Sequence, residues 1–128
     1  MNDADIQEMK EILAVCEQPD FVAATWPNSQ YYPDYHPAVD RLMTFPFRCS
    51  PAIDPYAVLP EDPDGTLPGV HLADMIRTKE DIESATLHQV LRYLAITSRG
   101  ERFCDGYIAK QFDLGMIQLA LRRILTLT

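Results

Sequence analysis

The stretch SATLHQVLRYLAITSRG, residues 84–100, decides the fold because its apolar side chains recur every three or four residues. This spacing places them on one face of an α-helix, which consists of Leu87, Val90, Leu91, Leu94 and Ala95. Ser84 or Thr86 is a suitable N-cap residue, and Gly100 stands where a left-handed C-cap would end the helix. A helix with one apolar face must bury that face, so the stretch predicts a domain of several packed helices.

The segment after this helix is predicted to be a corner that leads into two further helices. Its members combine glycines with charged and aromatic side chains: Arg99, Gly100, Arg102, Phe103, Asp105 and Gly106. Gly100 would end the first helix and Gly106 would permit close approach of the next, while Phe103 would fill the gap between them. We therefore interpret the corner as structural.

The charged residues of the corner leave a second interpretation open. Arg99 and Arg102 can bond the free carbonyls of a helix end or pair with neighbouring acids such as Asp105. The same three groups would form an enzyme site or an anion site if they converged in a concave pocket.

Two helices are predicted beyond the corner. The first covers residues 106–112, has Asp105 as its N-cap and buries Tyr107, Ile108 and Phe112. Gly115 separates it from the second, which covers residues 116–127. The inward-facing positions of this last helix are Ile117, Leu121, Ile124 and Leu125.

Two more helices are predicted in the N-terminal part. Residues 3–17 form the first, with Asn2 or Asp3 as N-cap and a proline soon after its end. Its apolar face consists of Ile6, Met9, Ile12, Leu13 and Cys16. Residues 37–45 form the second, with Pro37 in its first turn.

The middle of the chain is dominated by proline. Six prolines fall within residues 46–68, a density that excludes a long helix or an interior strand. Residues 53–59 and 71–77 are each compatible with one short helix. The pattern as a whole predicts a mainly α, compact, single-domain bundle of about five to six helices with a long proline-rich irregular segment in the middle.

With these elements placed, the C-terminal part resembles a known family. The run Arg99-x-x-Arg102-Phe103-x-x-Gly106 follows a leucine-rich helix and precedes Phe112-x-x-Gly115-x-Ile117 and a terminal helix. This arrangement, over about residues 85–127, is similar to the signature of the bacterial and phage proteins grouped as domain of unknown function 6508.

The earlier part of the chain resembles that family more loosely. YYPDYHPAVDRLMTF, residues 31–45, is similar to the family's aromatic segment that leads into a helix. Where many members have an Asp-Trp pair, this chain has Asp54-Pro55-Tyr56. The resemblance implies a related fold and an association with phages and mobile elements, and it implies no activity.

The charge distribution indicates the kind of partner. Residues 1–84 carry 16 acidic and 5 basic side chains, whereas residues 85–128 carry 3 acidic and 6 basic ones, for a net charge of −8. Nucleic acid and anionic membranes would be repelled, so the expected partner is a basic protein surface. Residues 21–35 are predicted to form an irregular aromatic loop. The candidate partner-binding residues are the acids of two segments and the tyrosines of this loop: Glu61, Asp62, Asp64, Glu80, Asp81, Glu83, Tyr31, Tyr32 and Tyr35.

Motifs for catalysis are missing from the sequence. There is no phosphate loop, dinucleotide fingerprint or HExxH, and the three cysteines lie far apart, as do the three histidines. We therefore expect no metal, no cofactor and, on balance, no enzyme. The odd cysteine count, the acidic N-terminus and the lack of a run of roughly 18 apolar residues predict a cytoplasmic protein.

Three functional hypotheses follow from these observations. The first is a non-enzymatic module that presents its acidic surface to a basic partner, for instance an inhibitor that occludes the nucleic-acid site of a host defence complex such as a CRISPR effector. The second is a small enzyme at the corner around Arg99, Arg102 and Asp105. The third is a helical module that forms dimers through an exposed apolar face, so the protein is expected to be a monomer or a homodimer.

Overall fold

The computed structural model describes residues 2–26, 33–49, 76–100 and 106–128. Within them the chain forms six helices and one small β-hairpin, and the helices pack compactly, which confirms the predicted mainly α bundle. The elements in chain order are α1 (Asp3–Cys16), β1 (Ala24–Thr25), β2 (Asp34–Tyr35), α2 (Pro37–Cys49), α3 (Lys79–Glu83), α4 (Leu87–Gly100), α5 (Tyr107–Asp113) and α6 (Met116–Leu127).

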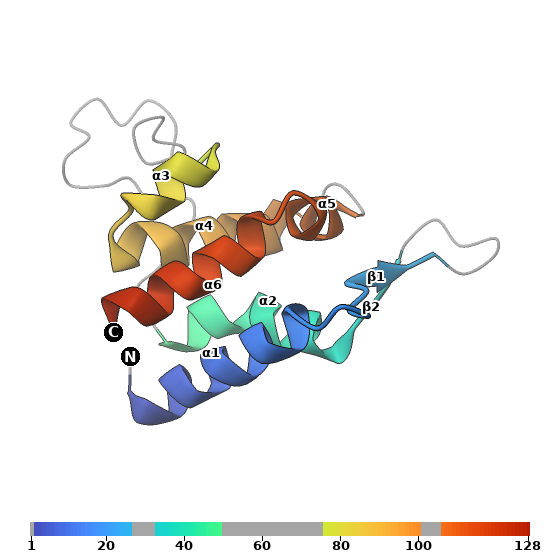
Figure 1. Cartoon of the computed structure of the whole chain (residues 1–128), viewed down its shortest axis with the longest axis horizontal. Helices are drawn as coiled ribbons and strands as arrows, with labels where there is room; N and C mark the ends of the chain where they lie inside the picture. Colours follow the sequence, from blue (N-terminus) through green and yellow to red (C-terminus); the bar gives the residue numbers. More distant parts are fainter. Residues whose placement is uncertain (1, 27–32, 50–75, 101–105) are drawn as a thin grey trace.

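Helices α4 and α6 form the centre of the bundle (Figure 1). α6 packs against α1, α3, α4 and α5, while α4 also packs against α2 and α5. α1 and α2 lie side by side across one face of this central pair, and α3 covers its opposite side. The hairpin of β1 and β2 extends from the end of the bundle where α1 stops and α2 begins.

The buried face of α4 is the one predicted from its spacing. Val90 and Ala95 are fully buried, and Leu91 and Leu94 are nearly so. α6 contributes Ile117, Leu121 and Ile124, and α1 contributes Met9, Ile12 and Cys16 to the same core. Each such aliphatic side chain stabilises the fold by about 1.5–3 kcal/mol on burial, so these faces hold the bundle together.

Reciprocal capping bonds define the starts of α1, α3 and α4. Asn2 Oδ1 accepts from the Asp5 N–H at α1, and the Asp5 carboxylate accepts from the Asn2 N–H in return. At α4 the Gln89 N–H donates to Thr86 Oγ1 (3.2 Å) and the Thr86 N–H donates to Gln89 Oε1 (2.9 Å). Of the two caps considered for the central helix, Thr86 is therefore the one that is used.

The predicted role of Gly100 as a left-handed C-cap is wrong. Gly100 is the last residue of α4, and only Gly106 and Gly115 of the described glycines have a positive φ. The physical requirement at Gly100 is space, because a Cβ there would lie 2.8 Å from the ring of Tyr107. The predicted Asp105 cap is also wrong: the N-cap of α5 is Gly106, which has φ 88° and no side-chain capping bond.

Other boundaries differ from the predicted ones. α1 ends at Cys16, and α2 continues beyond residue 45 through Pro46 to Cys49. Residues 79–83, predicted only as acids before the central helix, form α3. The aromatic loop includes a two-stranded antiparallel sheet that was not predicted. Of the short helix predicted at 71–77, residues 76–77 are not helical, and the rest lies outside the described residues, as does the turn predicted at 53–59.

Candidate protein-interaction site

The corner after α4 is only partly described. Arg102, Phe103 and Asp105 lie outside the described residues. The two glycines that bracket the corner each have an aromatic ring against them, because a Cβ at Gly106 would lie 2.9 Å from the ring of Trp26 and one at Gly100 would meet Tyr107. Close packing of rings is thus a sufficient reason for both glycines.

The acids of α3 do not form a uniform binding face. The Asp81 carboxylate accepts from the backbone N–H groups of Arg77 (2.9 Å) and Thr78 (3.0 Å). These bonds lower the pKa of Asp81 below its usual value, since they favour the charged form. Asp81 is therefore engaged in the capping box of α3, whereas no such bond holds Glu80 or Glu83 within the described residues, and all three side chains are exposed. Glu61, Asp62 and Asp64 lie outside the described part of the chain.

The aromatic loop is built into the protein by Phe21. Its ring lies 5.2 Å from the ring of His36, edge to face, and 5.6 Å from that of Phe112 on α5. His36 in turn begins α2, because its Nδ1 accepts from the Ala38 N–H (3.1 Å). Phe21 thus holds the first strand of the hairpin against α5 and the start of α2. Tyr35 on β2 is half-buried, and Tyr31 and Tyr32 lie outside the described residues.

Two large apolar side chains beside this anchor are exposed. Val22 is 56% exposed and Trp26 is 53% exposed. Leu114, which follows Asp113 at the end of α5, is exposed to a similar extent, 51%, but it lines neither of the hairpin cavities described below. Tryptophan is enriched among the residues that dominate the energy of protein interfaces, so Trp26 marks the hairpin as a candidate contact surface.

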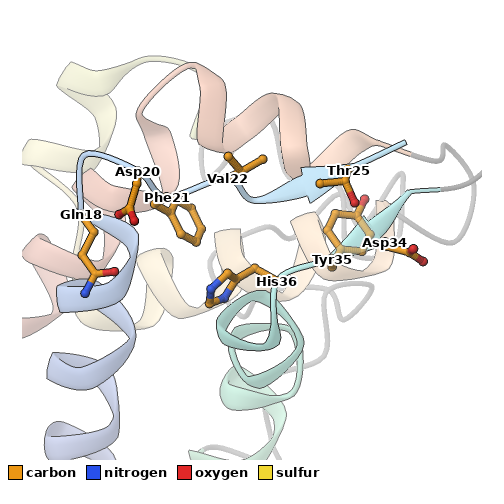
Figure 2. A pocket seen from close by; sticks show the side chains of 8 residues that line it. All are labelled: Gln18, Asp20, Phe21, Val22, Thr25, Asp34, Tyr35 and His36. Atoms are coloured by element: carbon orange, nitrogen blue, oxygen red, sulfur yellow. The ribbon is translucent and has the colours of Figure 1, made fainter. Parts of the chain in front are cut away.

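A cavity lies on each side of the β1 segment. The first, of about 350 Å³, is lined by residues from the α1–β1 connection and from β2, including Asp20, Val22 and Asp34 (Figure 2). The second, of about 450 Å³, lies between the β1 segment and the helices α5 and α6. Its lining is Phe21, Val22, Ala23, Ala24, Trp26, Ala109, Phe112, Asp113 and Gln118.

The charged side chains of both cavities are acidic. Asp20 and Asp34 line the first cavity, Asp113 lines the second, and neither has a lysine or an arginine in its described lining. We call the exposed residues around the two cavities the hairpin surface: Asp20, Val22, Trp26, Asp34 and Asp113. It combines apolar contact area with negative charge.

Two arginines elsewhere are paired with acids of the same protein. Arg41 on α2 pairs with Glu8 (3.4 Å) and Glu11 (3.0 Å), and Arg122 pairs with Glu17 (2.8 Å). The bond from Arg41 lowers the pKa of Glu11, because the guanidinium favours the carboxylate. These pairs neutralise one face of α1 and leave the hairpin surface negative.

A third cavity, of about 280 Å³, lies between α4 and α5 with Arg77 and Leu114 in its lining. Its central polar contact is internal, since the Tyr93 hydroxyl donates to Gln111 Oε1 (2.8 Å). Burial raises the pKa of Tyr93, so this phenol stays protonated. The described lining of this cavity contains no carboxylate and no histidine.

The described residues contain neither a metal site nor a membrane-spanning helix. No group of three or more His, Cys, Asp or Glu side chains among the described residues is arranged to hold a metal ion. None of the helices in residues 2–26, 33–49, 76–100 and 106–128 is long and apolar enough to cross a bilayer.

The fold and the hairpin surface define a small, mainly helical protein with an exposed surface that combines acidic and apolar side chains. Residues 71–128, just under half of the chain, match the family of unknown function DUF6508, which confirms the resemblance seen in the C-terminal signature. No curated protein and no solved structure matches the chain.

Proposed function

We propose that this protein is an interaction module that binds a basic protein partner through its hairpin surface. The observation that carries the proposal is the coincidence of two exposed apolar side chains, Val22 and Trp26, with three carboxylates and no described cation in the cavities between them. Apolar anchors supply affinity at an interface, and charges around them steer a partner of opposite sign.

The partner we propose within this class is a protein whose basic surface normally binds nucleic acid. Such surfaces are rich in arginine and lysine and would meet Asp20, Asp34 and Asp113 favourably. An inhibitor that occludes the nucleic-acid site of a host defence complex, such as a CRISPR effector, would act in this way. The overall net charge of −8 would also attract a basic partner.

In this proposal the binding site is centred on the hairpin, whereas the sequence placed three of the predicted binding acids on what is now α3. Asp81 is engaged by two backbone N–H groups, so it is less available to a partner than its sequence context indicates. Glu80 and Glu83 remain as secondary contacts in this proposal. The hairpin differs from α3 because it adds exposed apolar area to its acids.

The experiment is a pull-down from lysate of the native host, quantified by mass spectrometry at low and at high salt. Val22→Ser and Trp26→Ala are compared with Leu114→Ser, which removes an equally exposed apolar side chain outside the hairpin surface. We expect a basic protein that is retained at low salt, reduced at high salt, lost with the two hairpin variants and kept with the Leu114 variant.

Two results would contradict the proposal. One is a partner whose retention is the same for all three variants. The other is self-association, seen as a mass that rises with concentration and falls with Val22→Ser, which would make the hairpin surface a homodimer interface. Melting curves of each variant show whether a loss of binding reflects a loss of folding.

A further inference from the structure

We propose that the partner binds through an extended basic segment that pairs with the outer edge of β1 and lies in the cavity between β1 and α5. This inference rests on the proposed function and names the mode of binding at the same site. The addition of a strand to an exposed sheet edge is a recurring way for domains to bind peptides.

The register of the hairpin leaves one edge of β1 open. Ala24 is opposite Tyr35 and Thr25 is opposite Asp34, and the His36 N–H donates to Ala23 C=O (2.9 Å). In an antiparallel pair the residues between hydrogen-bonded positions turn their backbone groups away from the partner strand. The N–H and C=O of Ala24 therefore point away from β2, toward the outer edge.

This outer edge borders the larger cavity. Residues 21–24 and Trp26 form one wall, and α5 together with the start of α6 forms the other, with no residue of β2 in the lining. β1 lies between β2 and α5 in both views of the molecule (Figure 1, Figure 2). A chain placed in the cavity would thus lie directly against the donors and acceptors of the β1 edge.

A buried oxygen in the wall of the cavity has no bond within the described residues. The Gln118 side chain donates through Nε2 to Phe112 C=O (3.3 Å), which identifies the nitrogen because a carbonyl can only accept. Its Oε1 is buried and has no hydrogen-bond partner. Leaving a buried acceptor unsatisfied destabilises a protein, and a ligand N–H group in the cavity reaches this atom only when the Gln118 side chain turns toward it.

The charges of the wall specify the ligand further. Asp113 is the one ionised side chain in the described lining of this cavity, and Asp20 and Asp34 lie in the adjoining one. Apart from Gln118, the other lining side chains are apolar: Phe21, Val22, Ala23, Ala24, Trp26, Ala109 and Phe112. An extended chain alternates its side chains between two directions, so alternating lysine or arginine with apolar residues matches this surface.

The probe is a fluorescein-labelled heptapeptide of alternating lysine and valine, titrated with the full chain and followed by fluorescence anisotropy at low salt. We expect it to bind, and we expect the peptide with glutamate in place of lysine not to bind. A third peptide, N-methylated along its backbone, keeps the side chains and the charge but cannot donate. We expect its affinity to be at least about fivefold lower, since it loses at least one hydrogen bond.

Two variants test the protein side of the same contacts. Gln118→Met removes the free acceptor at constant length, and Ala24→Pro removes the outward N–H at an edge position where proline is tolerated. Each is expected to weaken the lysine-valine peptide about fivefold. Gln7→Met, at an exposed position on α1, is the matched control and is expected to leave binding unchanged. If Ala24→Pro lowers the melting temperature, the N-methylated peptide is used in its place to test the backbone hydrogen bonds, because that peptide is titrated with the unaltered protein.

The outcomes separate this inference from the proposed function. No binding of the lysine-valine peptide, or equal binding of its N-methylated form, overturns strand addition. The same variants are then placed in the lysate pull-down. If Val22→Ser abolishes retention while Gln118→Met and Ala24→Pro do not, the hairpin surface binds a partner and strand addition is wrong. If none of these variants changes retention, both proposals fail.

Discussion

Gly106 and Gly115 share a left-handed backbone but differ in what lies against them. Their φ angles are 88° and 75°, which L-residues adopt at a cost of about 1–2 kcal/mol. A Cβ at Gly106 would also meet the Trp26 ring at 2.9 Å, whereas one at Gly115 would meet only the flexible end of Lys79 at 3.4 Å.

We therefore expect Gly106→Ala to be the more destabilising of the two variants. Gly115→Ala is expected to lower the free energy of unfolding by about 1 kcal/mol and Gly106→Ala by about 2 kcal/mol or more, since Trp26 must move as well. Urea denaturation followed by circular dichroism gives both values. Equal losses for the two variants would show that the Trp26 contact carries no energy.

Cys16 is predicted to be chemically inert in the folded protein. The thiol is buried in the core, and burial raises its pKa to about 11. At neutral pH almost none of it is thiolate, which is the reactive form. We expect the peptide that contains Cys16 to be alkylated by iodoacetamide only in denaturant, as measured by mass spectrometry.

The raised pKa also sets the direction of a pH effect on stability. Because the folded thiol ionises at a higher pH than the unfolded one, its contribution is complete below the unfolded pKa and is lost as pH rises toward 11. Cys16→Ala is expected to remove this alkaline loss while it leaves a smaller core side chain. Alkylation of Cys16 at neutral pH without denaturant would contradict its burial.

The residues on which the proposed binding depends most are the ones that the sequence predicted least well. Trp26 and Val22 were part of a predicted loop, and their exposure follows from where Phe21 anchors that loop. Gln118 looks like an ordinary helix position, and its unsatisfied Oε1 depends on a contact with Phe112 C=O six residues earlier. No local pattern carries either fact, since both arise from tertiary packing.

At the scale of the elements, helix α3 depends on one carboxylate. Asp81 closes a capping box with Thr78 and also accepts from the Arg77 N–H. Its lowered pKa means that this contribution is present above the unfolded pKa and is lost as pH falls through the folded pKa. The matched control is Glu80, an exposed acid of the same turn.

We expect Asp81→Ala to lower stability more than Glu80→Ala at neutral pH. The difference should shrink as pH falls through the acid range, because protonation removes the charged acceptor from the parent protein as well. Urea midpoints of the parent and both variants, measured from neutral to acid pH, provide the test. A difference that is independent of pH would mean that Asp81 acts through packing and not through its charge.

The elements that could be predicted are those with enough residues to show a period. α1, α4 and α6 each have at least three turns, so their apolar faces repeat and most of the predicted inward positions are buried. On α4 burial extends beyond the predicted face to Arg92, Tyr93, Thr97 and Ser98. α3 has five residues and each strand has two, which is too short for any repeat to be visible. α2 continues through Pro46, past the end that a proline normally indicates.

At the scale of the whole molecule, the packing of α1 against α6 joins the two ends of the chain. Ile117 of α6 is fully buried, while the ion pair of Arg122 with Glu17 lies on the surface with the Arg122 side chain 55% exposed. We expect Ile117→Ala to cost about 2–5 kcal/mol and Arg122→Ala less than about 1 kcal/mol. Thermal or urea unfolding measures the loss of stability in each variant. A loss for Arg122→Ala well above about 1 kcal/mol would show that the Arg122–Glu17 pair stabilises the fold more than a surface ion pair does.

The charge of the molecule and its apolar anchors are expected to act on different steps of binding. The acids Asp20, Asp34 and Asp113 attract a basic partner over a distance, so they govern the association rate and its dependence on salt. Val22 and Trp26 make contact only in the complex, so they govern dissociation. The lysine-valine heptapeptide allows both to be measured by stopped-flow anisotropy.

Changing Asp20, Asp34 and Asp113 to asparagine, one at a time and together, is expected to slow association at low salt, several-fold for the triple variant, and to flatten its salt dependence, with dissociation nearly unchanged. Val22→Ser is expected to speed dissociation with association nearly unchanged. Asp40→Asn, an exposed acid on α2 outside the hairpin surface, serves as the control for a general change of charge. If Asp40→Asn slows association as much as the change of any one hairpin acid does, net charge alone steers the partner and the position of the hairpin carboxylates does not matter.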